Sequence, residues 1–248
     1  MQVVLQRVAA WAAGRDGAPI ASAEDWSRWA EAPRPLGAEG QPEVAFLPPA
    51  VRRRATRLTR MMLQVAFDAT EGLDRSAMRS VFASRHGAIH VAVRILASIA
   101  KQEAVSPLQF SHSVHNAQAG LFSIAAGNRE ASSSIAAEQD TFGHGFLEAV
   151  LQLERSGSHP VLLVVADEPV PDNLAHLVEE PTGAYALALL LVREGDGRRL
   201  EFSLAPSREL LPAHDWPDAV EFLRFLESDE PELTLGHARR RWCWKRTG

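Results

Sequence analysis

Two continuous apolar runs constrain the fold of this chain more than any other feature of its sequence. They cover residues 161–166 and 184–192, and both are far shorter than the roughly 20 apolar residues of a membrane-spanning helix. Uninterrupted runs of this length are typical of strands that are covered on both faces of a sheet. The sequence therefore predicts a buried sheet between helices, and no membrane span.

Helix and strand signals alternate along the rest of the chain. Ser22 and Asp25 have the spacing of a capping box and predict a short helix, while residues 33–49 hold five prolines and two glycines and predict a loop. One amphipathic helix is expected over residues 51–69, where apolar residues recur at steps of four and three. The arginines lie mostly on its other face, at Arg52, Arg53, Arg54, Arg57 and Arg60.

The remaining elements complete the pattern. Further strands are predicted at residues 3–13, 81–83, 132–137, 185–192 and 200–204, the last two as partners joined by the turn at 195–197. Further helices are predicted with Ile89, Val93, Leu96 and Ile99 on one, over residues 116–126, with Phe142, Phe146, Val150 and Leu153 on another, and from 215 to 226. This order indicates an α/β fold with a mixed sheet covered by helices.

Length and composition agree with one principal domain. The chain has 248 residues, of which 46% are hydrophobic and 23% are charged, which is the ordinary range for globular proteins. We expect residues 1–205 to form this domain, and residues 206–248 to form a helix and a basic, tryptophan-containing tail packed on it. The lone Cys243 excludes an intrachain disulfide and predicts a reducing, cytoplasmic location.

Charge gives little support to nucleic-acid binding. The net charge is −5, so no whole-protein attraction to nucleic acid or anionic membrane is expected. The basic tail that contains Trp242 and Trp244 has the composition of a stacking platform for single-stranded nucleic acid. A final strand with both tryptophans packed on one face is the interpretation that we favour.

Common catalytic motifs are missing. The sequence has no GxGxxG, GxxxxGK, GxSxG or HExxH pattern. His112 and His115 form an HxxH pair, but no carboxylate stands near them at a useful spacing, and His86 with His90 has ordinary helical spacing. We expect structural roles for these histidines, with no metal and no cofactor.

The informative stretch runs from Ser106 to Glu168. It contains Ser106-Pro107, then Val114-His115-Asn116-Ala117 and Ala119-Gly120, then Ser132-Ser133-Ser134-Ile135-Ala136, a helix, a buried strand and Asp167-Glu168. This order resembles the first half of a β-ketoacyl synthase of the thiolase superfamily. The resemblance implies a thiolase-like fold of which only the N-terminal ketosynthase half is present.

The nucleophile position is where the sequence departs from that family. Alignment along the predicted strand places Gln139 where the family has a reactive cysteine on a tight turn. A carboxamide nitrogen has no usable lone pair and cannot form the thioester of the condensation reaction. The second half of a ketosynthase, which carries the catalytic histidines, has no counterpart in a chain of this length.

The resemblance therefore implies a partner of an enzyme. Chain length factors carry glutamine at this position, and the chain most resembles the truncated ketosynthase-like subunit of aryl polyene and xanthomonadin-type pigment clusters. It implies a heterodimer with a full-length β-ketoacyl synthase, in which this chain shapes the acyl tunnel; the alternative is a glutamine-dependent decarboxylase of malonyl-loaded acyl carrier protein.

The resemblance also implies roles for individual residues. The expected acyl-tunnel residues are Phe110, Val114, His115 and Asn116, and the expected interface residues are Ser132, Ser133, Ser134, Ile135 and Ala136. Arg53 and Arg57 are a candidate contact for an acidic acyl carrier protein, with a solvated helix face as the simpler explanation.

Overall fold

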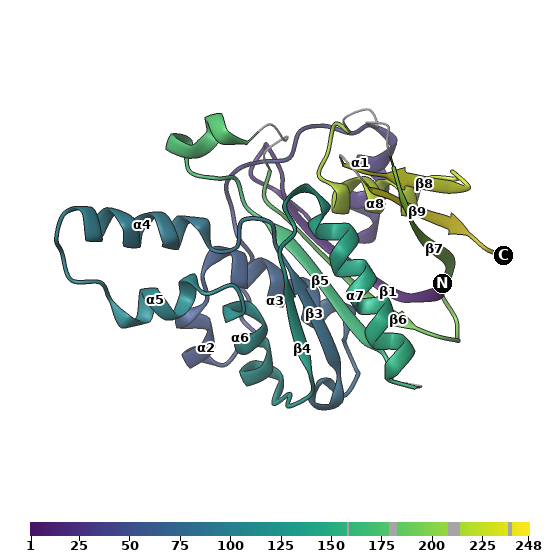
Figure 1. Ribbon diagram of the computed structural model, residues 1–248, viewed down its shortest axis with the longest axis horizontal. Coiled ribbons are helices and arrows are strands. Elements are labelled where there is room, and N and C mark those ends of the chain that lie inside the picture. The colour runs from purple at the N-terminus through teal and green to yellow at the C-terminus, as the bar shows by residue number, and fades with distance from the viewer. Residues whose placement is uncertain (158, 179–182, 208–213, 238–239) are drawn as a thin grey trace.

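The computed structural model describes residues 1–157, 159–178, 183–207, 214–237 and 240–248. Its centre is one mixed sheet with the strand order β4-β3-β5-β6-β1-β7-β9-β8, and β2 is paired to β1 (Figure 1). The strands are β1 (Gln2–Ala13), β2 (Pro19–Ile20), β3 (Arg79–Ala83), β4 (Ser132–Ile135), β5 (Val161–Asp167), β6 (Tyr185–Val192), β7 (Arg198–Pro206), β8 (Glu232–Leu235) and β9 (Arg240–Arg246). The pairs β3–β4 and β3–β5 are parallel, and the pairs from β5–β6 onward are antiparallel.

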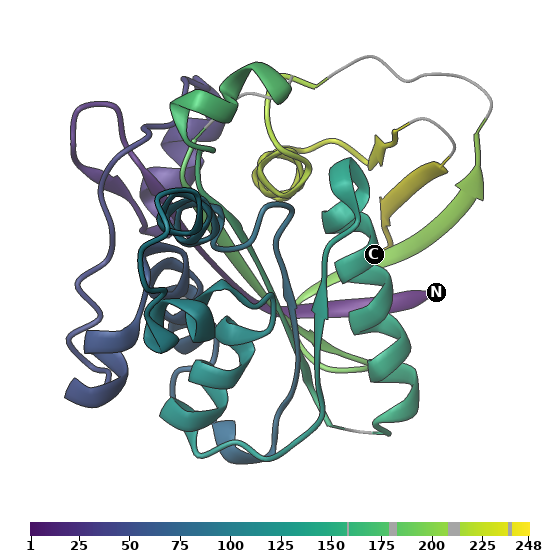
Figure 2. The ribbon, with the colours of Figure 1, turned by 60° about the vertical axis from the view of Figure 1, so that its left-hand side comes forward.

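Helices cover both faces of this sheet. Side chains of α1 (Ala23–Glu31), α7 (Thr141–Arg155) and α8 (Asp218–Glu227) join the core on one face. Side chains of α3 (Arg57–Ala69) and α6 (Ala117–Ala126) join the core on the other, and Figure 2 shows the sheet between α7 and these helices. Alternate residues of β5 belong to opposite cores, which confirms that this apolar run is a strand covered on both sides.

The sequence-based boundaries hold for several elements. Ser22 caps α1 with Asp25 in a full capping box, and α6 ends at Gly127, whose φ of 64° is the left-handed conformation that glycine adopts without strain. Short 3-10 turns complete the fold as η1 (Arg75–Ala77), η2 (Glu138–Asp140) and η3 (Asp172–Leu177). No helix within the described residues is long and apolar enough to cross a membrane.

The predicted single helix over residues 51–69 is wrong. The chain forms α2 (Pro49–Arg54) and then α3, with a break at Ala55 and Thr56. The Thr56 side chain accepts a hydrogen bond from the backbone N–H of Thr59 and so starts a new helix. A capping threonine competes with helix continuation, and the apolar periodicity does not register this competition.

The predicted hairpin between residues 185–192 and 200–204 is also wrong, because β1 lies between β6 and β7. The connecting turn crosses the end of β1 at close range: a Cβ at Gly197, whose φ is 144°, would lie 2.4 Å from the carbonyl oxygen of Leu5. The glycine is therefore needed for a crossing over a strand. A glycine-rich turn signals a local reversal and does not show which strands become neighbours.

The helices α4 (Ile89–Ala100) and α5 (Pro107–Ser113) form an arm that projects from the body (Figure 1). The predicted apolar stripe of α4 is wrong in its second half, because Leu96 and Ile99 are 64% and 57% exposed. Val91 and Ile95 are buried instead, in a small cluster that is separate from both main cores.

The C-terminal segment extends the sheet and wraps around α7. Trp242 and Trp244 of β9 are fully buried. Trp244 contacts Phe142 and Phe146 of α7, and both tryptophans contact Phe202 of β7. This confirms the predicted final strand. The alternative prediction, a stacking platform for single-stranded nucleic acid, is wrong because neither buried indole can reach a base.

Candidate functional site: the turn before α7

The turn η2 connects β4 to α7 at the position where the resemblance predicts a nucleophile. The Thr141 hydroxyl fixes this turn, because it accepts a hydrogen bond from the N–H of Ala137 at 2.9 Å and donates one to the carbonyl of Glu138 at 2.7 Å. Glu138 has a φ of 51°, a strained conformation for a residue with a Cβ. Nucleophile elbows place the reactive residue on such a turn, and here it exposes Glu138 and Gln139.

A thiol is missing from this turn. The only cysteine, Cys243, lies in β9 between Trp242 and Trp244. Successive side chains of a strand point to opposite faces, and both tryptophans belong to the core that α7 shares. The Cys243 side chain therefore lies on the face of β9 that is turned away from α7.

Asp140 attaches the turn to the C-terminal strand. Its buried carboxylate accepts hydrogen bonds from the indole N–H of Trp242 at 2.7 Å and from the Arg240 guanidinium at 3.2 Å. Gly143, in the first turn of α7, lies directly against the same indole, and a Cβ there would be 2.4 Å from Trp242 Cε2. The C-terminal strand thus covers the start of α7 and fixes the backbone around Gln139.

An inner cavity of about 170 Å³ lies beneath the turn. The C-terminal residues His214, Trp216 and Asp218 line it together with Asp167 and Gln139. Pockets that enclose a small-molecule ligand usually measure roughly 300–1,000 Å³. The chain's own C-terminal segment therefore leaves too little room beneath Gln139 for a long acyl chain.

An outer recess of about 830 Å³ borders the same turn and is more open to solvent than the inner cavity. Gln139 lines it together with His86, His144 and His237. The carboxylate of Asp218 is 3.0 Å from His237 Nε2. Burial, and then the nearby Arg240 guanidinium, lower the pKa of His144. The recess thus combines a carboxamide with histidines that all come from this chain.

Two buried carboxylates lie at the end of β5, and sequence reasoning assigned them no role. Asp167 accepts hydrogen bonds from the Ser84 hydroxyl and from the backbone N–H groups of Arg85 and His86 at 2.8–3.1 Å. Burial raises the pKa of Asp167 although these hydrogen bonds oppose the shift. Burial also raises the pKa of Glu168. Their position directly after a buried strand was the signal that could have marked them.

The expected tunnel residues divide into two groups. Phe110 is 62% exposed and Val114 is 40% exposed, both at the arm, and Asn116 is exposed as well. His115 is half-buried, and its Nε2 lies 3.0 Å from the carbonyl oxygen of Ser84, so it holds the arm to the body. The arm and α6 expose further large apolar side chains at Leu96, Ile99, Leu108 and Ile124.

The expected interface residues lie on an edge strand. β4 pairs with β3 and has no second neighbour in the described part of the sheet. The carbonyls of Ala131 and Ile135 accept hydrogen bonds from Ser80 of β3 and from Ser84 directly after it. Because the N–H and C=O of one residue point the same way in a parallel pair, those of Ser134 point outward. The backbone N–H and C=O of Ser133 point toward β3, and its hydroxyl donates a hydrogen bond to Glu148 of α7.

The two arginines of the expected carrier contact have different environments. Arg53 is exposed at the end of α2. Arg57 donates hydrogen bonds to the carbonyls of Ala38 and Gly40, and burial lowers its pKa. Arg57 thus holds the proline-rich loop against α3, and the arginine exposed together with Arg53 is Arg54.

Comparisons with known proteins agree with this architecture. Residues 26–245 match the family model of the β-ketoacyl synthase N-terminal domain, and no curated protein matches the sequence. A chain from the structure of a ketosynthase in complex with its chain length factor from Xenorhabdus doucetiae aligns with a TM-score of 0.81 and 27% identity, over 99% of this chain and 100% of that chain.

Two more distant structures show the same fold. The ishigamide ketosynthase/chain length factor aligns with a TM-score of 0.62 and 13% identity, over 82% of this chain and 67% of that chain. A β-ketoacyl synthase from Burkholderia phymatum aligns with a TM-score of 0.60 and 12% identity, over 84% and 65%. The mixed sheet with its helices is therefore the thiolase-like fold that the sequence resemblance implied.

Proposed function

The chain belongs to the β-ketoacyl synthase N-terminal domain family, and from this membership we propose that it is a non-catalytic, chain-length-factor-like subunit. In this proposal it forms a heterodimer with a complete β-ketoacyl synthase and shapes the acyl tunnel of that enzyme. The observation that carries the proposal is the turn before α7, which has the backbone of a nucleophile elbow but exposes Glu138 and Gln139 in place of a cysteine.

The closed environment of the turn supports a non-catalytic role. The inner cavity measures only about 170 Å³, and Asp140 with Trp242 fixes the turn from below. An acyl chain bound in the inner cavity would have to displace the buried aromatic core around α7, whereas the outer recess is open and would not shield a growing chain from solvent. We therefore assign growth of the product to the partner.

Two surfaces support the heterodimer. Among the described strands, β4 pairs only with β3, so its outward N–H and C=O groups form a sheet edge that a second strand can extend. The arm exposes Phe110, Leu96 and Ile99, and isolated soluble proteins seldom leave so many large apolar side chains on neighbouring helices. A chain from the X. doucetiae structure of a ketosynthase with its chain length factor aligns with this chain over its whole length.

An acidic acyl carrier protein is the proposed third component. Arg53 and Arg54 are exposed in the last turn of α2 and offer it a basic contact whose strength would fall with salt.

Co-purification tests the heterodimer. A tagged copy of this chain, expressed with the complete ketosynthase of its gene neighbourhood, should retain that enzyme in a one-to-one complex. A matched preparation with an unrelated homodimeric ketosynthase is the control. Equal recovery of both enzymes, or of neither, would contradict the proposal.

The outer recess favours a second candidate function. Gln139 shares it with His86, His144 and His237, so histidines of this chain lie close to the carboxamide. In a malonyl thioester the bond to the carboxylate would break, carbon dioxide would leave, and the Gln139 amide would stabilise the enolate until its carbon took a proton from water. Carbon dioxide release from malonyl-loaded carrier protein that depends on Gln139 would select this function over the first.

A further inference from the structure

The arm leaves the body and returns to it beside one buried carboxylate, and we propose that Asp167 is the residue that positions the arm. Its consequence for product length rests on the proposed function, whereas the positioning itself is a property of this chain alone.

The departure of the arm depends directly on Asp167. Its Oδ1 accepts hydrogen bonds from the Ser84 hydroxyl at 2.8 Å and from the N–H of His86 at 3.1 Å, and its Oδ2 accepts one from the N–H of Arg85 at 3.1 Å. These donors lie in the segment between β3 and α4. One carboxylate thus sets the direction in which the chain leaves the sheet.

The return of the arm is attached to the same segment. His115 follows α5, and its Nε2 lies 3.0 Å from the carbonyl oxygen of Ser84. The Ser84 hydroxyl, which donates to Asp167, also accepts a hydrogen bond from the N–H of Gly87 at 2.9 Å. A displacement of Ser84 would therefore move both ends of the arm together.

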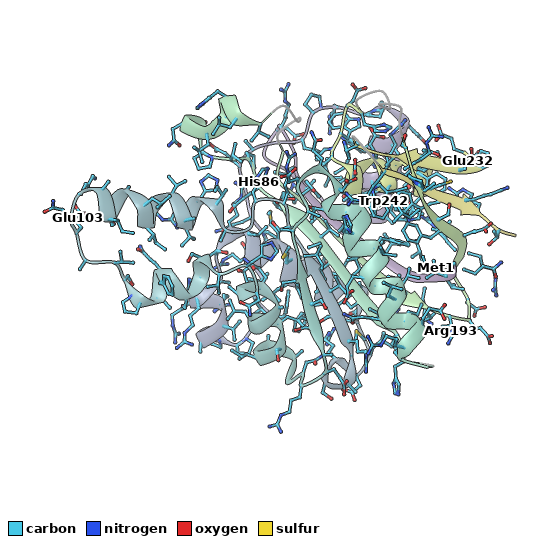
Figure 3. The ribbon with its side chains drawn as sticks, viewed as in Figure 1. Met1, His86, Glu103, Arg193, Glu232 and Trp242 are labelled. Atoms are coloured by element: carbon cyan, nitrogen blue, oxygen red, sulfur yellow. The ribbon has the colours of Figure 1, made fainter. Side chains whose placement is uncertain are left out.

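Packing against the body cannot replace these hydrogen bonds. The buried residues of the arm and its base, Ala88, Val91 and Ile95, form a small cluster of their own with Val105 beside it, separate from both main cores. Figure 3 shows His86 where the arm begins and Glu103 at its far end, away from the body. The contact of His90 Nε2 with the Pro169 carbonyl, at 2.7 Å, is a second attachment of α4 to the segment after β5.

Length makes the arm sensitive to its base. The 12 residues of α4 span about 18 Å at 1.5 Å per residue, so a rotation of about 10° at the base moves the far end by about 3 Å. Such a shift is larger than one methylene group. Phe110 of α5 would be displaced with it, which would change the length of the proposed tunnel.

The test uses Asp167→Asn, which keeps the size of the side chain but converts one acceptor oxygen into a donor that faces backbone N–H groups. Asp218→Asn is the matched control, because Asp218 is equally buried and lines the same inner cavity but bonds His237 rather than the base of the arm. Hydrogen exchange is measured on the full chain by mass spectrometry.

We expect the amides of residues 85–100 and 107–115 to exchange about tenfold faster in Asp167→Asn than in the parent chain, with no change in Asp218→Asn. Parent-like protection of α4 and α5 in a folded Asp167→Asn chain would overturn the proposal, and so would equal loss in the control. If Asp167→Asn does not fold, Ser84→Ala, which removes the shared hydroxyl, is measured against the same two outcomes.

Products of the complex with the ketosynthase separate this proposal from the proposed function. A broader product distribution from an assembled Asp167→Asn complex, together with faster exchange in the arm, supports both. Faster exchange with the parent's products supports the positioning role and contradicts length control by this chain.

Discussion

The C-terminal strand that covers α7 and the arm differ in the exposure of their large apolar side chains. Around α7, Trp242 and Trp244 are fully buried against phenylalanine rings. On the arm, Phe110 and Leu96 are 62% and 64% exposed. The first region completes the core of this chain, whereas no segment among the described residues covers the second.

This difference separates two requirements of the fold. The helix that follows the turn is apolar around much of its circumference, so a second layer must cover it, and β7, β9 and α8 supply that layer here. The arm needs no such cover if a partner supplies it. The buried region should therefore control stability, and the exposed region should control assembly and product.

Trp242→Ala tests the buried side of this comparison and should have the largest effect. It removes a fully buried indole and the hydrogen bond to Asp140, and should lower the free energy of unfolding by about 3–5 kcal/mol. Phe110→Ala, on the arm, should change it by less than about 0.5 kcal/mol. Urea denaturation measures the free energy of unfolding of both variants. A similar loss of stability in the two would contradict the comparison.

Ser134→Pro should abolish the heterodimer without unfolding this chain, because it removes an N–H that points out of the sheet. Ser133→Pro removes an N–H that faces β3 and should destabilise the chain itself. Ser134→Ala keeps the backbone donor and should assemble normally. Size-exclusion chromatography of the co-expressed complexes distinguishes these cases, and assembly of Ser134→Pro at parental strength would show that the interface lies elsewhere.

Phe110→Ala and Val114→Phe should shift the products toward longer and shorter chains respectively. A tunnel that ends at a large side chain admits another two-carbon unit only with strain of roughly 1–3 kcal/mol, which changes the product ratio about five- to more than a hundredfold. Mass spectrometry of the products measures the ratio. Parental products from both assembled variants would make the arm a docking element only.

Acid should affect Asp167 in a defined direction. Its pKa is raised above the ordinary value of 3.8 by burial, so the folded state binds its proton more tightly than the unfolded state does. Its contribution to stability is therefore fully present below pH 3.8 and is lost as the pH rises through the raised pKa. The stability difference between the parent and Asp167→Asn should shrink over that window in urea titrations, and a difference that grows with pH would contradict the shift.

The smallest effect is expected at the basic surface. Arg53→Glu with Arg54→Glu should slow turnover with acyl carrier protein by severalfold at low salt, since exposed ion pairs contribute roughly 0–1 kcal/mol each. The effect should vanish at high salt. Unchanged rates at low salt would show that these two arginines are only a solvated helix end. Arg57→Glu should instead disturb the loop that Arg57 holds.

Much of the fold could be predicted because local signals and tertiary structure agree. The buried strands β5 and β6, the capping box of α1 and the apolar stripe of α7 were all visible in the sequence. The failures have one cause, which is that a local pattern does not show what lies beside it. Thr56 ended a helix that the periodicity continued, and β1 entered between two strands that a glycine turn seemed to join.

The candidate site was predictable in part for the same reason. Gln139 could be placed through the family resemblance, which aligns it with the residue between a strand and a helix, and the structure puts it on the turn η2. Asp167 could not be given a role, since its donors come from a segment more than 80 positions earlier in the chain. The inner and outer cavities likewise depend on His237, about a hundred residues after the turn.

Intact-protein mass spectrometry of the reconstituted complex tests the central claim most directly. The complex is incubated with an acyl starter and malonyl-loaded carrier protein, and the mass of each subunit is measured during turnover. The account predicts an acyl adduct on the ketosynthase alone, and an unchanged mass for this chain. A covalent acyl adduct on this chain would contradict the claim that it takes part without a nucleophile of its own.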